Sequence, residues 1–263
     1  MWAEKTRNLT LRAMRHLVTK RNVENLASVI ISASPQSAWR TRTMVQQIAV
    51  GGLTAEELSL LGAIVPRTPS PFRVISVTRL LGWKGLGLAM RAFAQFKSQF
   101  PNSEYWIIGD GPEKRYLQHL ASTLGISDSV RLLGKLPRQS VLLMFQQVDV
   151  LLHASIHEQF GFVILEAMAA GKPAICLDVG GPSLILNSSV GCTVRANSME
   201  EGVEAVTRAL TSLACDPGRL REMGASARKY VQGAWDWSVV GERISSVLAA
   251  AVDHHVGHST DLH

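Results

Sequence analysis

Short apolar runs alternate with longer stretches of helical periodicity over most of this chain. The apolar runs occupy residues 73–77, 104–108, 130–133, 148–152, 174–177 and 191–194. Runs of this length are typical of strands buried on both faces of a sheet. Strands that alternate with helices predict an α/β fold with a doubly wound parallel sheet. Because the crossovers share one hand, the loops at the carboxyl ends of the strands gather at one edge.

The residues that precede this alternation have a different character. Residues 2–26 predict a basic amphipathic helix, which either lies on a membrane surface or is an ordinary surface helix with a solvated basic face. A short strand is expected at 29–31. The glycine pair Gly51 and Gly52 has the composition of a linker, and the T-P-S-P run at 68–71 is the clearest domain boundary.

Helices are also expected after the last strand, at 199–215, 219–231 and 238–252. Trp235 and Trp237 stand before the last of these, and a core pair of aromatic rings is one interpretation of them. Four histidines fall in the polar tail 253–263, for which disorder is the expectation and a metal site the alternative.

Composition and charge limit the classes of protein to which this chain can belong. Apolar residues make up 46% of the 263 residues, enough for a large core. The net charge of +6 permits an anionic partner without demanding one, and we expect no nucleic acid. The three cysteines Cys176, Cys192 and Cys215 are expected to be reduced packing residues of a cytoplasmic protein. The sequence begins without a signal-peptide pattern and contains no apolar run of membrane-spanning length.

Candidate chemistry concentrates in residues 155–171, S-I-H-E-Q-F-G-F-V-I-L-E-A-M-A-A-G. The pattern predicts a loop after a strand and then a helix over 162–170, ended by a glycine. The helix N-terminus at Phe160, Gly161 and Phe162 offers N–H groups that suit a phosphate. The carboxylates of Glu158 and Glu166 accept hydrogen bonds and suit hydroxyl groups. Phosphate and hydroxyl groups together describe a nucleotide-sugar.

The same stretch resembles the signature of retaining family-4 glycosyltransferases of the GT-B fold. The resemblance rests on Glu158 and Glu166 in the spacing Glu-x7-Glu, with F-G between them and E-A-M-A-x-G-K-P over the second. It implies a Rossmann-like GT-B C-terminal domain in which Glu158 contacts the donor sugar and Glu166 contacts the nucleotide ribose. The alternative is a pair of solvated glutamates that share a helix by chance.

A second loop, T-R-L-L-G-W-K-G at 78–85, carries two cations. Arg79 with its planar fork and Lys84 with its point charge suit the two phosphates of a diphosphate. The family pattern is similar, although this chain has Thr78 where a glycine is usual. The alternative is that both are ordinary surface cations.

Three further loops complete the expected ring. The I-G-D-G-P turn at 108–112 is interpreted as mainly structural, with the backbone of Gly109 near the ligand. The resemblance places the nucleotide base against Gly134, Lys135 and Leu136. The loop 178–182 closes the ring.

The resemblance therefore implies transfer of a sugar from a nucleotide-sugar to an acceptor hydroxyl, with retention at the anomeric carbon. It assigns residues 1–70 to the end of an acceptor domain plus linker and 71–252 to the donor-binding domain. For Trp235 and Trp237 it implies the alternative of a segment that lets the last helix cross back onto the first domain. No metal and no cofactor are expected, since the chain lacks an Asp-x-Asp triplet. The acceptor, a glycan or a lipid, stays undefined. The rest of the acceptor domain is expected from preceding residues or another chain, and peripheral contact with the inner membrane surface is a further expectation. The alternative function is a non-catalytic nucleotide-sugar-binding fragment or subunit.

Overall fold

The computed structural model describes residues 29–32, 44–47 and 51–259. The chain divides into two compact units, one formed by Val50–Val240 and the other by Met1–Ala49 with Gly241–His263. In the second of these units, β1 (Val29–Ser32) pairs in parallel with β2 (Met44–Gln47). The strand expected at 29–31 is therefore confirmed. The helix expected over 2–26 lies outside the described residues.

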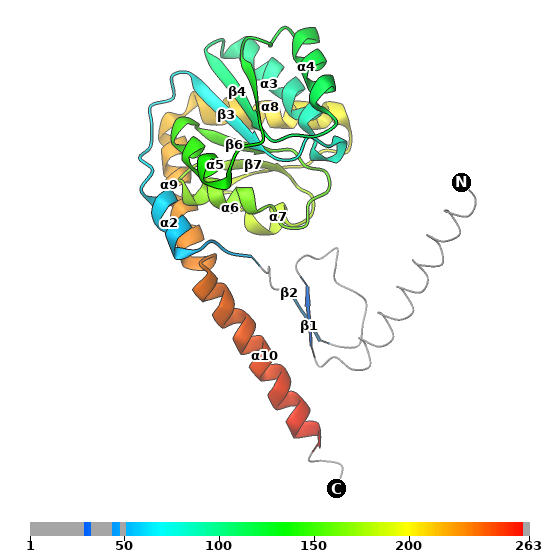
Figure 1. The fold of residues 1–263 in the computed structure, drawn as a ribbon, viewed down its shortest axis with the longest axis vertical. Coiled ribbons are helices and arrows are strands. Elements are labelled where there is room, and N and C mark those ends of the chain that lie inside the picture. The colour runs from blue at the N-terminus through cyan, green and yellow to red at the C-terminus, as the bar shows by residue number, and fades with distance from the viewer. Residues whose placement is uncertain (1–28, 33–43, 48–50, 260–263) are drawn as a thin grey trace, which may run out of the picture. The chain divides into compact units, whose positions relative to one another are not determined.

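The larger unit is built on one six-stranded parallel sheet (Figure 1). Its strands are β3 (Phe72–Val77), β4 (Ser103–Ile108), β5 (Val130–Gly134), β6 (Val150–His153), β7 (Ala174–Leu177) and β8 (Gly191–Val194). Their order across the sheet is β5-β4-β3-β6-β7-β8, and every pairing is parallel. The chain thus winds outward from β3 in one direction and returns to β6 to wind outward in the other. This is the doubly wound order, and its switch point lies between β3 and β6.

Helices cover both faces of this sheet (Figure 1). On one face α3 (Leu86–Gln99) packs against α4 (Lys114–Thr123) and α8 (Met199–Cys215). On the other, α6 (Phe162–Ala169) packs against α2 (Ala55–Gly62) and α9 (Pro217–Ala234). Alternate residues of each strand point to opposite faces, so Val74 joins the core under α3 whereas its neighbour Ile75 is buried on the other side.

The remaining elements are short, apart from the last helix. They are η2 (Gly82–Lys84), α5 (Arg138–Met144), η3 (Phe145–Gln147), α7 (Pro182–Ile185) and α10 (Trp237–Ser259). The helix expected at 238–252 continues to Ser259, so the disorder expected from residue 253 onward is not found up to that residue. The compact unit also begins at Val50 instead of residue 71, because α2 packs on α6.

The segment that holds Trp235 and Trp237 forms hydrogen bonds with the residue that follows Gly51 and Gly52. The Leu53 N–H donates to the Trp235 carbonyl at 2.8 Å, and the Trp237 N–H donates to the Leu53 carbonyl at 3.2 Å. A Cβ on Gly52 would lie 2.9 Å from that Trp235 carbonyl oxygen, so the close approach requires a glycine there. Trp235 is buried and Trp237 is 41% exposed, so they are not a core pair.

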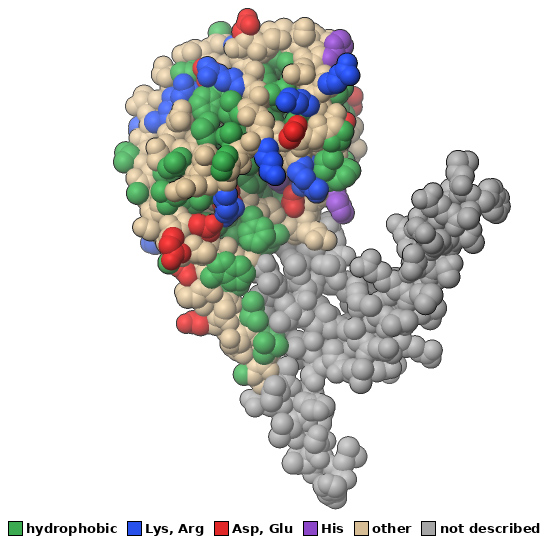
Figure 2. Space-filling model, in the orientation of Figure 1, with side chains coloured by type: hydrophobic (Ala, Val, Ile, Leu, Met, Phe, Trp, Pro, Cys, Tyr) green, Lys and Arg blue, Asp and Glu red, His purple; other side chains and the backbone are tan. Residues whose placement is uncertain are grey.

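The three cysteines, expected to be reduced packing residues, are free thiols, and Cys176 is buried, Cys192 is half-buried and Cys215 is exposed. Within the described part of the chain, every helix is too short or too polar to cross a bilayer. Figure 2 shows Lys and Arg side chains spread over one face of the larger unit, with acidic side chains among them. The basic excess does not form one uninterrupted patch on that face.

Candidate functional site

An ion pair joins two loops at the switch point of the sheet. Lys84 is the last residue of η2, in the loop after β3, and Glu158 lies in the loop between β6 and α6. The Lys84 Nζ donates to Glu158 Oε2 at 2.6 Å. The two side chains are only 12% and 19% exposed. The structure therefore brings together two of the residues that the sequence assigns to the donor, although it pairs them with each other.

The backbone explains why these loops approach so closely. Gly85 has φ +66°, and a Cβ there would lie 1.9 Å from the Ala154 carbonyl oxygen. The Trp83 carbonyl accepts from the Ile156 N–H at 2.9 Å and from the Ser155 Oγ at 3.3 Å. A glycine in the left-handed region and a shared carbonyl thus hold the segment around Lys84 against the loop that carries Glu158.

His153 is a site residue that the sequence analysis missed. It is the last residue of β6 and is 5% exposed. Its Nε2 lies 3.4 Å from Glu158 Oε2, and among the described residues it has no hydrogen-bond partner. The only signal was a polar residue that ends an otherwise apolar strand, V-L-L-H.

Electrostatics keep Glu158 ionised. The His153 imidazole and the Lys84 ammonium lower the pKa of Glu158 to about 2, against the effect of burial, which raises it. At neutral pH the carboxylate is therefore a pure hydrogen-bond acceptor. This is the form that suits the hydroxyl groups of a sugar.

The N-terminus of α6 stands directly after this carboxylate. Gly161 precedes the helix with φ +87°, and the Glu158 carbonyl accepts from the Gly181 N–H at 3.1 Å. The ring of Phe160 is buried, with ring centroids 4.7 Å from Phe162 and 5.5 Å from Trp235. The part of Phe160 that faces a ligand in our prediction is accordingly its backbone.

Glu166 lies in the second turn of α6 and forms a separate charged group. Its side chain is 5% exposed, and its Oε1 accepts from Arg138 Nη1 at 2.6 Å. The same guanidinium donates to Glu57 Oε1 through Nε, at 2.9 Å, and through Nη2. Burial raises the pKa of Glu166, and the positive charge of Arg138 opposes that rise. Neither Arg138 nor Glu57 was predicted.

The loops after β3, β4 and β5 are also in contact. Gly109 has φ +140°, and a Cβ there would lie 1.8 Å from the Thr78 carbonyl oxygen. Its N–H donates to the Gly134 carbonyl at 2.8 Å. Gly109 is thus structural, as interpreted, and links the predicted base loop to the residue before Arg79.

The two cations and the apolar residue that the sequence assigns to these loops are accessible to a ligand. Arg79 and Lys135 are exposed, and Leu136 is half-buried. Within the described structure, the side chains of Arg79 and Lys135 take part in no hydrogen bond or ion pair. The expectation that Arg79 and Lys84 grip one diphosphate together stays a prediction.

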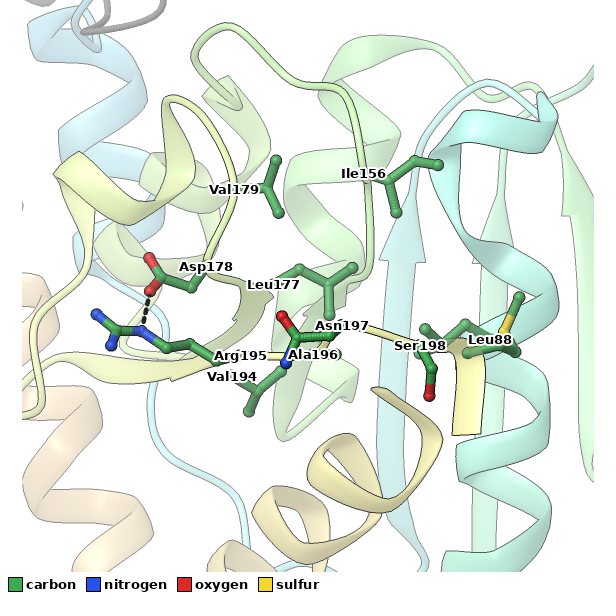
Figure 3. A pocket seen from close by; sticks show the side chains of 11 residues that line it. Leu88, Ile156, Leu177, Asp178, Val179, Val194, Arg195, Ala196, Asn197 and Ser198 are labelled. Atoms are coloured by element: carbon green, nitrogen blue, oxygen red, sulfur yellow. Dashed lines mark hydrogen bonds and ion pairs between the residues drawn. The ribbon is translucent and has the colours of Figure 1, made fainter. Parts of the chain in front are cut away.

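A pocket of about 490 Å³ opens at the same edge of the sheet (Figure 3). Leu177 and Val194, the last residues of β7 and β8, line it together with Ile156 from the loop that carries Glu158. Arg195 Nε donates to Asp178 Oδ2 at 2.6 Å at its side. The loop 178–182, expected to close the ring, therefore contributes Asp178 to a largely apolar pocket.

Metal-binding chemistry has no candidate in the part of the chain that the structure describes. No group of three or more His, Cys, Asp and Glu side chains there is placed to hold an ion. The site described above is built from the carboxylates of Glu57, Glu158 and Glu166, the imidazole of His153, cations and backbone amides.

Comparison with known proteins gives sequence similarity over about two thirds of the chain. Residues 64–230 match the family model of the glycosyl transferases group 1. A relative from Mycolicibacterium smegmatis, the GDP-mannose-dependent alpha-(1-6)-phosphatidylinositol monomannoside mannosyltransferase, is 29% identical over 184 residues, which cover 67% of this chain and 47% of that protein. The alpha-monoglucosyldiacylglycerol synthase of Acholeplasma laidlawii is 35% identical over 122 residues, 46% of this chain and 31% of that one.

Solved structures share the fold. The sucrose-phosphate synthase of Thermosynechococcus elongatus has a TM-score of 0.72 and 21% identity, over 90% of this chain and 62% of that one. HepE of Anabaena in complex with UDP and glucose has a TM-score of 0.68 and 22% identity, over 86% and 64%. The chain spans about half the length of the first of the two curated relatives and less of the second.

Proposed function

The chain belongs to the glycosyl transferases of group 1, and from that premise we propose that it binds a nucleotide-diphosphate sugar and transfers the sugar to an acceptor hydroxyl. The observation that carries this proposal is the state of Glu158. The carboxylate is held ionised, partly buried, at the switch point of a doubly wound sheet, where such folds bind their ligands. An acceptor-only group at that place suits a ligand rich in hydroxyl groups.

The neighbouring residues take the other parts of the donor in this proposal. Glu166 binds the ribose hydroxyl groups. Lys84 and Arg79 bind the diphosphate together with the backbone amides at Gly161. The base lies against Gly134, Lys135 and Leu136, beside the backbone of Gly109.

The ammonium group of Lys84 has enough N–H donors to bind Glu158 and a diphosphate at the same time. An ammonium group has three N–H donors, and the structure uses one of them on Glu158. The other two are free to donate to phosphate oxygens without breaking that ion pair. Lys84 would then hold the diphosphate beside the carboxylate that binds the sugar, and would stabilise the negative charge that develops as the diphosphate leaves.

We propose that transfer proceeds with retention of the anomeric configuration and without a metal ion. The departing diphosphate is neutralised by Lys84, Arg79 and the N-terminal end of α6 in this scheme. An acceptor hydroxyl must stand about 3–3.5 Å from the anomeric carbon, and we assign its placement to a surface outside residues 50–240.

A binding experiment determines which nucleotide the chain recognises. One relative is named for GDP-mannose, and one structural neighbour holds UDP and glucose, so UDP, GDP, ADP and their sugars form the probe panel. Calorimetric titration of the purified chain with each should give binding by at least one nucleotide diphosphate. Failure of all of them would overturn the proposed site.

A transfer assay with radiolabelled donors distinguishes a glycosyltransferase from a subunit that only binds the nucleotide-sugar. Release of labelled sugar to water or to an added acceptor supports the enzyme, and NMR of the product reports the anomeric configuration. Binding without any transfer, also in the presence of other cell components, would favour the non-catalytic nucleotide-sugar-binding subunit.

A further inference from the structure

A single guanidinium group connects the predicted ribose carboxylate to two other elements. Arg138 is the first residue of α5, directly after the loop that holds Gly134, Lys135 and Leu136. It donates to Glu166 on α6 and, through two nitrogens, to Glu57 on α2. Its side chain is 55% exposed, whereas that of Glu166 is 5% exposed. Arg138 therefore reaches from the surface to an almost fully buried carboxylate.

Glu57 is itself fixed, so Arg138 rests against a rigid partner. The Thr54 N–H donates to Glu57 Oε2 at 3.0 Å, and the Glu57 N–H donates to Thr54 Oγ1 at 3.2 Å. This reciprocal pair is the capping box that begins α2. Because Oε2 of Glu57 is committed to the cap, Oε1 is the atom that holds the guanidinium in place.

The charge balance at Glu166 depends on Arg138. Burial raises the pKa of Glu166, the nearby Glu57 carboxylate raises it further, and Arg138 is the cation that opposes both. Other charged groups near α6 are directed elsewhere. His153 faces Glu158, and Arg228 donates to the carbonyls of Ile64 and Ala170. Lys172 interacts with Asp149.

We propose that Arg138 is a positioning residue of the donor site, which keeps Glu166 ionised and turns it so that its remaining acceptor sites meet the ribose. The proposal rests on the proposed function, because it takes Glu166 to be the ribose ligand. A carboxylate has about four lone-pair sites on two oxygens, and Arg138 occupies one of them. The two hydroxyl groups of a ribose need two more. A protonated Glu166 would instead carry an O–H donor where an acceptor is required.

The test compares Arg138→Met with a matched variant, Arg131→Met. Arg131 is 56% exposed and also pairs with a carboxylate, Glu104, at 3.4 Å, but it lies on β5 away from Glu166. Nucleotide diphosphate binding is measured by calorimetry from pH 5.5 to 8.5. We expect Arg138→Met to weaken binding about fivefold or more at pH 6 and less at pH 8.5. Without Arg138 the pKa of Glu166 is higher, so a larger fraction of Glu166 is protonated at pH 6 than in the wild type. Arg131→Met should leave the profile unchanged, and Arg138→Lys should restore part of it.

A double variant shows whether Arg138 acts through Glu166. Once Glu166→Gln has removed the carboxyl group, adding Arg138→Met should cost little more, and the pH profile of the double variant should match that of Glu166→Gln alone. A pH profile of Arg138→Met identical to that of the wild type would overturn the proposal. Tighter binding by Arg138→Met would also overturn it, because Arg138 would then compete with the ribose.

Direct titration keeps this inference separate from the proposed function. The carboxyl carbon of Glu166, identified by its loss in Glu166→Gln, is followed by NMR against pH in the wild type and in Arg138→Met. We expect the pKa of Glu166 to be higher in the variant. If no nucleotide binds to the wild type, the proposed function fails, and an unchanged pKa in this titration separately refutes the role of Arg138.

Discussion

Lys84 Nζ lies 2.6 Å from Glu158 Oε2, across the switch point between β3 and β6. The two residues are 74 positions apart in the sequence, and the pattern of the chain assigned them to different parts of one ligand. Their contact means that the proposed diphosphate cation and the proposed sugar carboxylate are one electrostatic unit. Changing either residue therefore removes the hydrogen-bond partner of the other.

Replacement of Lys84 by Met should weaken nucleotide diphosphate binding by about 10- to 150-fold, because a charge-assisted hydrogen bond contributes about 1.5–3 kcal/mol. Calorimetric titration with UDP and GDP at low salt gives the number. Lys229→Met, which removes an exposed cation from α9, is the control and should bind like the wild type. Binding that is unaffected by Lys84→Met would return this residue to a purely structural role.

The depressed pKa of Glu158 makes stability depend on pH in a specific window. A carboxyl group whose pKa is about 2 in the folded state and near 4.5 when unfolded stabilises the fold at pH values above about 4.5. That contribution is lost as the pH falls from about 4.5 toward 2. The wild type should therefore lose more stability than Glu158→Gln in this window.

Urea unfolding at several pH values between 2.5 and 7 measures the difference between the two proteins. It should be constant near neutral pH and shrink steadily below about pH 4.5. A difference that does not change with pH would mean that Glu158 titrates normally in the folded chain.

The fold was predictable because its determinants are local. Each of the six apolar runs became a strand, with bounds within two residues of those expected. The largest shift is at β6, which begins at Val150 and not at 148. The reason is Asp149, whose carboxylate accepts from the Arg73 N–H at 2.8 Å and so belongs to the turn that enters the strand.

The site was predictable only where a motif marks it. Glu158 and Lys84 stand in recognisable loops, whereas Arg138 and Glu57 meet across 81 positions with no pattern that links them. His153 ends a strand, and its nearness to Glu158 arises only from the folding of the loop that follows β6. Contacts of this kind depend on packing between elements, and the periodicity of a single element carries no information about them.

The glycine at 85 should be essential to the geometry of the site. In Gly85→Ala the new Cβ would clash with the Ala154 carbonyl, and a non-glycine residue at φ +66° costs about 1–3 kcal/mol in backbone strain alone. We expect chemical denaturation to show a loss of at least this size. Gly82→Ala is the matched control in the same turn, since no heavy atom beyond Gly82 and its two chain neighbours lies within 4 Å of its Cβ position. It should change stability by less than about 0.5 kcal/mol. Equal effects of the two variants would show that the two loops do not approach as the structure has them.

Glu158→Gln should separate recognition of the sugar from recognition of the nucleotide. The carboxylate is proposed to accept hydrogen bonds from the sugar, so its loss removes contacts that only the nucleotide-sugar makes. The ratio of the dissociation constants of a nucleotide diphosphate and its sugar conjugate should therefore shift against the conjugate by about tenfold, the effect of one charge-assisted hydrogen bond.

The affinity for the nucleotide diphosphate alone should change much less, because the proposed partner of Glu158 is the sugar and the proposed partner of Lys84 is the diphosphate. Glu166→Gln is the informative comparison. The ribose is common to both ligands, so this substitution should weaken both by a similar factor and leave the ratio unchanged. The reverse pattern, in which Glu166→Gln shifts the ratio and Glu158→Gln weakens both ligands equally, would exchange the roles assigned to the two glutamates.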